Sequence, residues 1–179
     1  MYNTNDTELI EMITDSREYE KGYRLLIGQY KERLYWHIRR IVKNHDDADD
    51  ILQNTFIKVI KNIEKFKQES SLQTWLYRIA TNESISFINN KKHVSADSLD
   101  NNVLTVVSDD EVDYENVKLK LSKAIDLLPH KQKIVFNLRY YDEMSYQEIA
   151  NITHTSVGAL KSSFHLAVKK IEDFLKKEI

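Results

Sequence analysis

The sequence predicts an all-α protein made of two small helical domains joined by an acidic linker. Apolar residues recur at steps of three and four along most of the chain, as they do on one face of a helix. Three glycines and one proline in 179 residues leave little material for tight hairpins. Residues 94–117 contain seven acidic side chains and no lysine or arginine, and they lack a clear helical period. This pattern is typical of a solvated linker rather than a packed element.

The charge distribution gives the boundaries of the predicted domains. The chain has a formal net charge of −2 and a pI near 6.3, whereas nucleic-acid-binding proteins are usually basic. The charge is uneven, however: residues 1–93 have +1, residues 94–117 have −7 and residues 118–179 have +4. We therefore expect an N-terminal domain over 1–93, an acidic linker over 94–117 that like charges keep extended, and a C-terminal domain over 118–179.

Composition excludes several classes of protein. The absence of cysteine excludes disulfide scaffolds, cysteine-ligated zinc sites and thiol catalysis. Few glycines argue against glycine-rich phosphate loops. No apolar run approaches a membrane-spanning length, and the first residues show no signal-peptide pattern, so we expect a cytoplasmic protein without membrane insertion.

Three helices are predicted in the N-terminal domain, after a weaker short helix before Tyr23. The first has its apolar stripe between Tyr23 and Ile41, and the second between Ala48 and Ile63. Asp46 or Asp47 is placed to cap the second helix and to complement its dipole. The third helix is expected from about Ser71 to Asn90, with Trp75 near its buried stripe.

The C-terminal domain shows the pattern of a helix-turn-helix. A helix over residues 117–128 stops at Pro129, which suits the first turn of the next helix. Ser145 and Glu148 form a capping box that opens a short helix. Residues 153–156 interrupt it, and Thr155 or Ser156 can cap a long final helix. A short helix, a tight turn and a longer capped helix are the DNA-binding arrangement.

One face of the final helix is opposite its core stripe and suits DNA. Small polar residues near its N-terminus permit close approach, and cations further along can contact phosphates. An ordinary solvated helix face would show the same spacing, so spacing alone leaves that alternative open. The candidate residues are Ser156, Gly158, Lys161, Ser162, Ser163, His165 and Lys169.

Two segments resemble a known family. Residues 128–175, LPHKQKIVFNLRYYDEMSYQEIANITHTSVGALKSSFHLAVKKIEDFL, closely resemble the promoter-recognising C-terminal domain of bacterial sigma factors. Residues 47–92, DADDILQNTFIKVIKNIEKFKQESSLQTWLYRIATNESISFINNKK, resemble their N-terminal helical domain. Their order, with only a short linker between them, is similar to the extracytoplasmic-function (ECF) group. Ser163 and Leu166 depart from the family pattern, because they occupy positions where a basic residue is frequent. The resemblance therefore leaves open which DNA sequence is recognised at the minus-thirty-five element.

The resemblance implies a function and its partners. A sigma factor binds core RNA polymerase through the β′ clamp and the β flap, recognises the minus-ten and minus-thirty-five promoter elements and nucleates strand opening. It implies that the final helix recognises the minus-thirty-five element. An anti-sigma factor is a further candidate partner, and we expect a monomer when the protein is free. The residues implied to bind the clamp are the outer stripe of the second predicted helix, Asp50, Gln53, Asn54 and Ile57.

The resemblance also implies a minus-ten site in the loop before the third helix and on the helix itself. The family loop captures a flipped base, and extrusion of a base is offset by pocket contacts and stacking. The polar loop residues supply donors and acceptors, and Tyr77 offers a ring for stacking. The implied residues are Phe66, Gln68, Glu69, Ser70, Ser71, Tyr77, Arg78 and Asn82.

Two alternatives remain open on the sequence alone. The first is a stand-alone helix-turn-helix regulator whose residues 1–93 form a sensor or dimerisation domain. The second is an enzyme using His45–Asp50, HDDADD, as a metal or phosphohydrolase cluster. Aspartates are favoured at a helix start in any case, and successive helical positions point in different directions. We expect no catalytic, cofactor-binding or metal-binding residue.

Overall fold

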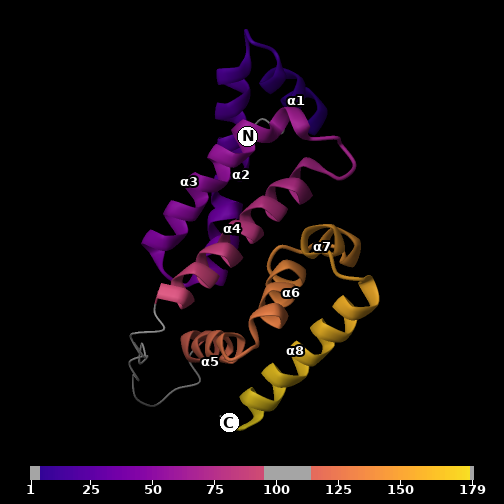
Figure 1. The fold of residues 1–179 in the computed structure, drawn as a ribbon. Coiled ribbons are helices and arrows are strands. Elements are labelled where there is room, and N and C mark those ends of the chain that lie inside the picture. Colours follow the sequence, from indigo (N-terminus) through magenta and orange to yellow (C-terminus); the bar gives the residue numbers. More distant parts are fainter. Residues whose placement is uncertain (1–4, 95–113, 178–179) are drawn as a thin grey trace.

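The computed structural model describes residues 5–94 and 114–177, which form helices and connecting turns without a strand in these ranges. The N-terminal lobe consists of α1 (Asp6–Thr14), α2 (Tyr19–Val42), α3 (His45–Asn62), a short 3-10 turn η1 (Ile63–Lys65) and α4 (Leu72–Val94). The C-terminal lobe consists of α5 (Tyr114–Asp126), α6 (His130–Tyr140), α7 (Tyr146–Thr153) and α8 (Val157–Lys177). Figure 1 shows the two lobes side by side, with α7 next to α4. The all-α prediction is confirmed.

The side-chain caps predicted for α7 and α8 are present in the structure, but the one predicted for α3 is not. Ser145 and Glu148 form the predicted capping box, and the Ser156 hydroxyl accepts a bond from the Ala159 amide at the start of α8. The prediction that Asp46 or Asp47 caps α3 is wrong. The Asn44 side chain accepts from the Asp47 amide at 3.0 Å, because the helix begins at His45. Both aspartates lie instead in the first turn, where they complement the helix dipole.

The acidic segment is shorter than expected at both ends. Val94 is the last residue of α4, and Tyr114 already begins α5. The remainder of the predicted linker, residues 95–113, lies outside the described residues. The charge pattern therefore did not predict the helix ends on either side of this segment.

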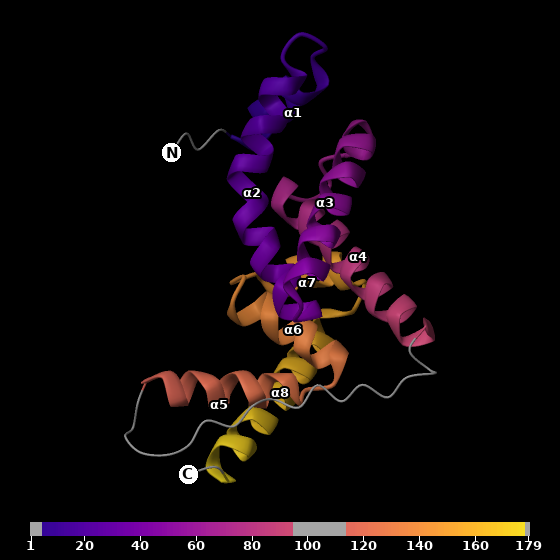
Figure 2. The same cartoon turned by 90° about the vertical axis from the view of Figure 1, so that its left-hand side faces the viewer.

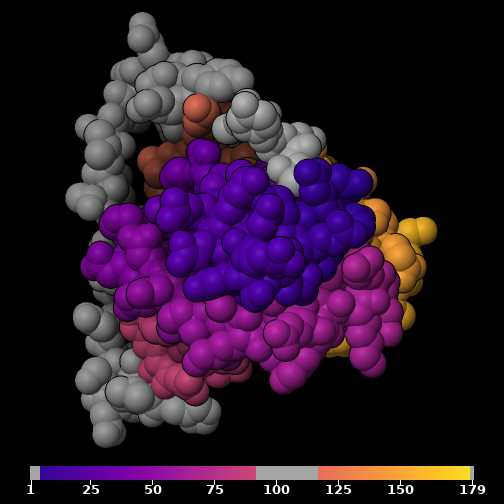
Figure 3. All heavy atoms as spheres, turned by 90° about the horizontal axis from the view of Figure 1, so that it is seen from above, coloured from indigo at the N-terminus to yellow at the C-terminus, as the bar shows by residue number. Residues whose placement is uncertain are grey.

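The lobes share one hydrophobic core. Leu34, Leu52 and Leu76 of the N-terminal lobe belong to the same buried cluster as Leu138 and Ile149 of the C-terminal lobe. Helix α7 packs on α4, and α6 packs on α2 (Figures 1 and 2). Viewed from above, the N-terminal helices cover most of the C-terminal lobe, which is visible mainly at one edge (Figure 3). A second, smaller core joins α5, α6 and α8 around Phe136 and Ala167. The sequence predicted two domains, but not that they pack together.

A half-buried ion-pair cluster supports the C-terminal lobe and joins it to α2. Asp126 accepts from Lys133 at 2.7 Å and lies 2.9 Å from the Lys43 ammonium. Burial opposes ionisation of Asp126, but the hydrogen bonds from both lysines outweigh it and lower the pKa of the carboxyl. Burial lowers the pKa of the Lys133 ammonium, and Asp126 counteracts that shift. The carboxylate therefore holds an otherwise uncompensated buried cation.

Asp126→Asn is expected to lower the free energy of unfolding by about 1–3 kcal/mol, because it leaves the Lys133 charge buried without its counter-ion. Urea unfolding measures this loss, and Asp173→Asn, at an exposed position of α8, is the control. The pKa of the Asp126 carboxyl is lower in the folded than in the unfolded protein. Its ionised form therefore stabilises the fold at neutral pH, and this stabilisation is lost as the pH falls through the folded-state pKa. The difference in the free energy of unfolding between the wild type and Asp126→Asn should thus disappear in acid. Equal stability of the wild type and Asp126→Asn at neutral pH would contradict the role of Asp126 as the counter-ion of Lys133.

Candidate polymerase and nucleic-acid interfaces

The outer stripe of α3 is an open polar face with apolar side chains in it. Asp50, Gln53 and Asn54 are exposed, and Ile57 is 41% exposed. The opposite side of α3 is buried through residues such as Leu52 and Phe56, which fixes the direction in which the stripe faces. We call these four residues the clamp face. The structure adds Ile60, 42% exposed one turn further along, which the sequence pattern did not single out.

The acidic cluster at the start of α3 is engaged in local contacts. His45 lies 2.7 Å from the Tyr35 hydroxyl, and Asp47 accepts from Lys91 of α4 at 2.9 Å. Asp49 lies 3.6 Å from the other ring nitrogen of His45. Within residues 5–94 and 114–177, no three histidine, aspartate or glutamate side chains are grouped so as to hold a metal ion. The acidic cluster is therefore the start of a helix with ion pairs. These contacts favour its interpretation as a helix start over that as a metal or phosphohydrolase cluster.

The outer side of α8 presents the predicted DNA-facing residues. The buried side of this helix is anchored by Leu160, Ala167 and Ile171. The capped N-terminus of α8 and the left-handed His154 at the end of α7 hold the two helices of the motif at a sharp turn. All seven candidates lie together on α8 or at its start, and only Ser163 is partly buried. We call this the recognition face: Ser156, Gly158, Lys161, Ser162, Ser163, His165 and Lys169.

The loop between η1 and α4 is ordered by a helix cap. The Ser71 hydroxyl accepts from the Thr74 amide at 3.1 Å, so this candidate base contact is also the N-cap of α4. Gln68 has a left-handed backbone, with φ of 56°, and its side chain is exposed together with that of Glu69. Phe66 packs against Trp75, with ring centroids 5.1 Å apart. Trp75 is buried, in agreement with the core role expected for it.

Tyr77 does not offer the free ring that the sequence suggested. It is 2% exposed and packs against His37 with ring centroids 4.9 Å apart. Burial, and next the charge of Asp142, raise the pKa of its phenol. Because Asp142 belongs to the C-terminal lobe, the packing of the lobes contributes to this environment. In this arrangement a base cannot stack on Tyr77.

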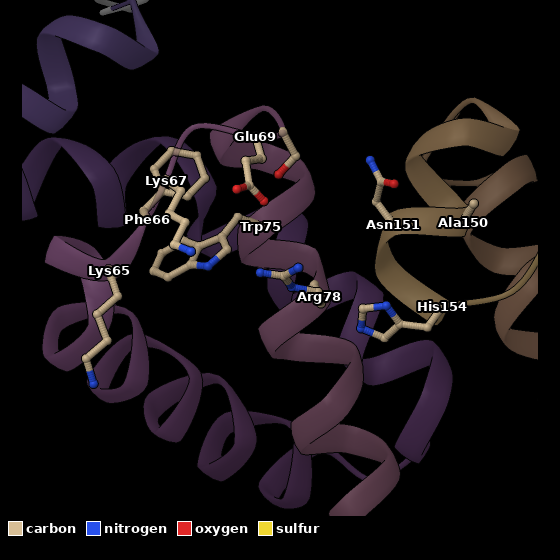
Figure 4. Close-up of a pocket in the computed structure, with 10 residues that line it drawn as sticks. Lys65, Phe66, Lys67, Glu69, Trp75, Arg78, Ala150, Asn151 and His154 are labelled. Carbon is tan, nitrogen blue, oxygen red and sulfur yellow. The ribbon is translucent and has the colours of Figure 1, made fainter.

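A pocket of about 410 Å³ lies between the loop that joins η1 to α4 and the helix α7. From the N-terminal lobe it is lined by Phe66, Trp75 and a set of cations, Lys65, Lys67 and Arg78. From the side of α7 it is lined by Ala150, Asn151 and His154, which lie across the gap from Arg78 (Figure 4). Arg78 is partly buried and forms no ion pair with any described residue. Asn82 is exposed one turn along α4, at the edge of a neighbouring pocket.

No pattern in the sequence indicated the polar contacts between the lobes. Asp142, in the turn between α6 and α7, lies 2.7 Å from His37 Nδ1 and accepts from Arg40 at 3.0 Å. The other ring nitrogen of His37 lies 2.9 Å from the Thr81 hydroxyl of α4. His37 is fully buried, and the Asp142 side chain is 4% exposed. About a hundred residues separate these partners, so no local pattern links them.

Comparisons with known proteins match both lobes. The family model described as Sigma-70 region 2 matches residues 26–94, and that described as Sigma-70, region 4 matches residues 118–171. The chain is 36% identical to the ECF RNA polymerase sigma factor SigW of Bacillus subtilis over 152 residues, covering 78% of this chain and 81% of SigW. It is 29% identical to the ECF RNA polymerase sigma-E factor of Haemophilus influenzae, covering 94% of each chain.

Solved structures show the same fold. The sigma factor RpoE in complex with the anti-sigma factor NepR from Bartonella quintana matches with a TM-score of 0.71, 22% identity and coverage of 87% of this chain and 98% of that one. CnrH in complex with the cytosolic domain of CnrY matches with a TM-score of 0.72, 18% identity and coverage of 97% and 99%. With both regions matched in order, and with SigW similar over most of its length, the chain belongs to the ECF family of RNA polymerase sigma factors.

Proposed function

We propose that this protein binds core RNA polymerase and directs promoter-specific initiation of transcription, with each surface described above having one task. The observation that supports this most directly is that an open clamp face on α3 and an open recognition face on α8 occur in one chain whose two lobes match sigma regions 2 and 4. Residues 1–93 would bind the polymerase clamp and the minus-ten element. Residues 118–179 would bind the minus-thirty-five element and the β flap, with residues 94–117 connecting them.

The clamp face would bind the coiled coil of the β′ subunit. A polar surface around one apolar anchor is the common composition of a protein interface, and Ile57 is that anchor. Asp50, Gln53 and Asn54 surround it and are not occupied by other described residues. Ile60 extends the apolar part of the surface by one turn.

The recognition face would contact the minus-thirty-five element in the major groove. Gly158 and Ser162 permit close approach of α8, and Lys161 and Lys169 supply cations for phosphates. The exposed His165 can contact either a base edge or the backbone. A flexible lysine contributes more to affinity than to sequence recognition.

The minus-ten segment would hold the non-template strand. Gln68 and Glu69 present polar groups at the tip of the loop, and Lys67 and Arg78 supply positive charge beside it. Ser70 and Ser71 complete the polar rim, and Asn82 extends it along α4. Since extruding a base costs a few kcal/mol, contacts of about 1–3 kcal/mol for each stacked base can offset it.

Partners and location follow from the same proposal. One structure of similar fold contains a sigma factor with an anti-sigma factor, and another contains CnrH with the cytosolic domain of CnrY, so a protein inhibitor is a candidate partner here. None of the described helices is both long and apolar enough to span a membrane. We propose a cytoplasmic protein, monomeric when free, that takes no part in catalysis itself.

Dependence on the polymerase separates this function from that of a stand-alone regulator. The C-terminal domain has a net charge of only +4, and each phosphate contact adds about 0.9 to the salt slope of binding. We expect the chain alone to bind promoter DNA weakly and to bind it tightly with core polymerase. Electrophoretic mobility shifts with and without core measure this difference. Tight, sequence-specific binding without core would instead favour the regulator.

A further inference from the structure

A groove between α2, α5 and α6 belongs to none of the three surfaces proposed above. Its volume is about 690 Å³, which is within the usual range for small-molecule sites. The end of α2 meets α6 here (Figure 2), and α5 supplies the third wall. From the end of α2 it is lined by Trp36, Arg39 and Lys43, whose spacing of three and four residues places them on one helix face. From α6 it is lined by Lys133 and Asn137, four residues apart.

The groove is positively charged. Four lysine and arginine side chains and one carboxylate line it. The carboxylate, Asp126, is already occupied, because it lies 2.9 Å from the Lys43 ammonium and accepts from Lys133 at 2.7 Å. Arg39 is partly buried and forms no ion pair with any described residue. An unpaired, partly buried guanidinium favours an anion that accepts two parallel hydrogen bonds, as a phosphate does.

An aromatic ring is exposed beside these cations. Trp36 is 50% exposed, although tryptophan is highly buried on average. Its contact with Tyr35 is edge-to-face, with ring centroids 5.3 Å apart and planes at 75°, so Tyr35 covers at most one face of the indole. An open indole face next to positive charge is suited to stacking on a planar ring that carries phosphate groups.

A buried amide without a partner also lines the groove. Asn137 is 0% exposed, and neither polar atom of its side chain is hydrogen-bonded to a described residue. Buried polar groups are almost always hydrogen-bonded, and an unsatisfied one destabilises the fold. The last torsion of an asparagine side chain is soft, so the amide can turn toward a ligand in the groove. It offers both a donor and an acceptor, which match the polar edge of a nucleobase.

We propose that this groove binds a nucleoside phosphate. The base stacks on the open face of Trp36, and the phosphates bind Arg39 and Lys43. Asn137 hydrogen-bonds the polar edge of the base or the sugar. An inorganic anion would leave Trp36 and Asn137 without a role, and an uncharged ring would leave Arg39 without one. The site is separate from the clamp face and the recognition face, so its test needs no polymerase.

Isothermal titration calorimetry of the full-length chain with ATP and with GTP tests the proposal. We expect at least one of them to bind with a dissociation constant below about 1 mM, and its nucleoside and inorganic tripolyphosphate to bind at least about tenfold more weakly. Trp36 is one of two tryptophans, and the other, Trp75, is buried. Binding should therefore quench tryptophan fluorescence. Trp36→Phe should lose this quenching and keep the affinity within about threefold, because phenylalanine also offers a ring face.

Further substitutions locate the ligand in the groove. Arg39→Ala and Trp36→Ala should each weaken nucleotide binding about tenfold. Lys31→Ala, which removes an exposed cation of α2 outside the groove, should bind like the wild type. Asn137→Leu keeps nearly the same side-chain shape, so it should weaken binding about tenfold without lowering the midpoint of thermal unfolding. A purely structural role of Asn137 would instead lower the midpoint and leave the affinity unchanged.

Four results would overturn the proposal. The first is no binding of either nucleotide up to about 1 mM. The second is equally tight binding of tripolyphosphate, which would indicate a general anion-binding surface. The third is unchanged affinity of both Arg39→Ala and Trp36→Ala, which would place the nucleotide elsewhere on the chain. The fourth is tighter binding of a mixed-sequence single-stranded oligonucleotide in this groove, which would assign it to nucleic acid rather than to a free nucleotide.

Discussion

Ile57→Asp is expected to reduce affinity for core RNA polymerase at least about 30-fold. Ile57 is the apolar anchor of an otherwise polar clamp face, and such anchors account for much of the binding energy of an interface. Aspartate both removes the buried apolar area and requires desolvation of a charge, for a combined cost of more than about 2 kcal/mol. Competition with a labelled sigma factor for core polymerase measures the loss.

The Ile57→Asp substitution should leave the fold and the helix packing unchanged, because Ile57 is on the outer side of α3. Ile57→Leu is the matched control, since it keeps an apolar side chain of equal size, and it should bind within about threefold of the wild type. Circular dichroism of both variants should show the same helix content. Full polymerase affinity of Ile57→Asp would place the clamp contact elsewhere on the chain.

Lys161→Ala combined with His165→Ala is expected to lower initiation from promoters that depend on a minus-thirty-five element by about 10- to 100-fold. Both side chains are exposed on the recognition face, one turn apart on α8. A base contact is worth about 1–3 kcal/mol in discrimination, whereas a phosphate contact adds affinity, so losing Lys161 should reduce the salt slope of binding by about 1. Affinity for core polymerase in the absence of DNA should not change.

The matched control for this variant is Lys176→Ala, which removes a cation from the last turn of α8, away from the recognition face. It should retain wild-type initiation. If the double variant initiates normally at promoters whose minus-thirty-five element is required, recognition does not occur through this face of α8.

Local features of the fold were predictable from the sequence because local chemistry determines them. The capping box at Ser145 and the turn before α8 are formed by residues a few positions apart, and the structure has them as predicted. The predicted cap of α3 was wrong by two or three residues because Asn44, Asp46 and Asp47 are all suitable caps. The spacing of residues in the sequence could not determine which of them caps α3, because that also depends on the packing of α2 against α3.

Long-range contacts were not predictable, and they matter most at the candidate minus-ten site. The family resemblance implied that Tyr77 offers a free ring on α4, but this side chain is buried and the other lobe packs on α4. The contact between His37 and Asp142 joins positions that no local pattern connects. A charge count likewise identified the acidic segment without indicating that the lobes on either side of it share a core.

This chain is expected to turn core RNA polymerase into a promoter-specific enzyme. Run-off transcription with purified core polymerase, the full-length chain and a library of promoter sequences tests it most directly. We predict initiation that requires the chain, is lost with Ile57→Asp and selects templates sharing a two-part sequence upstream of the start site. Transcription that is the same with and without the chain would contradict the account.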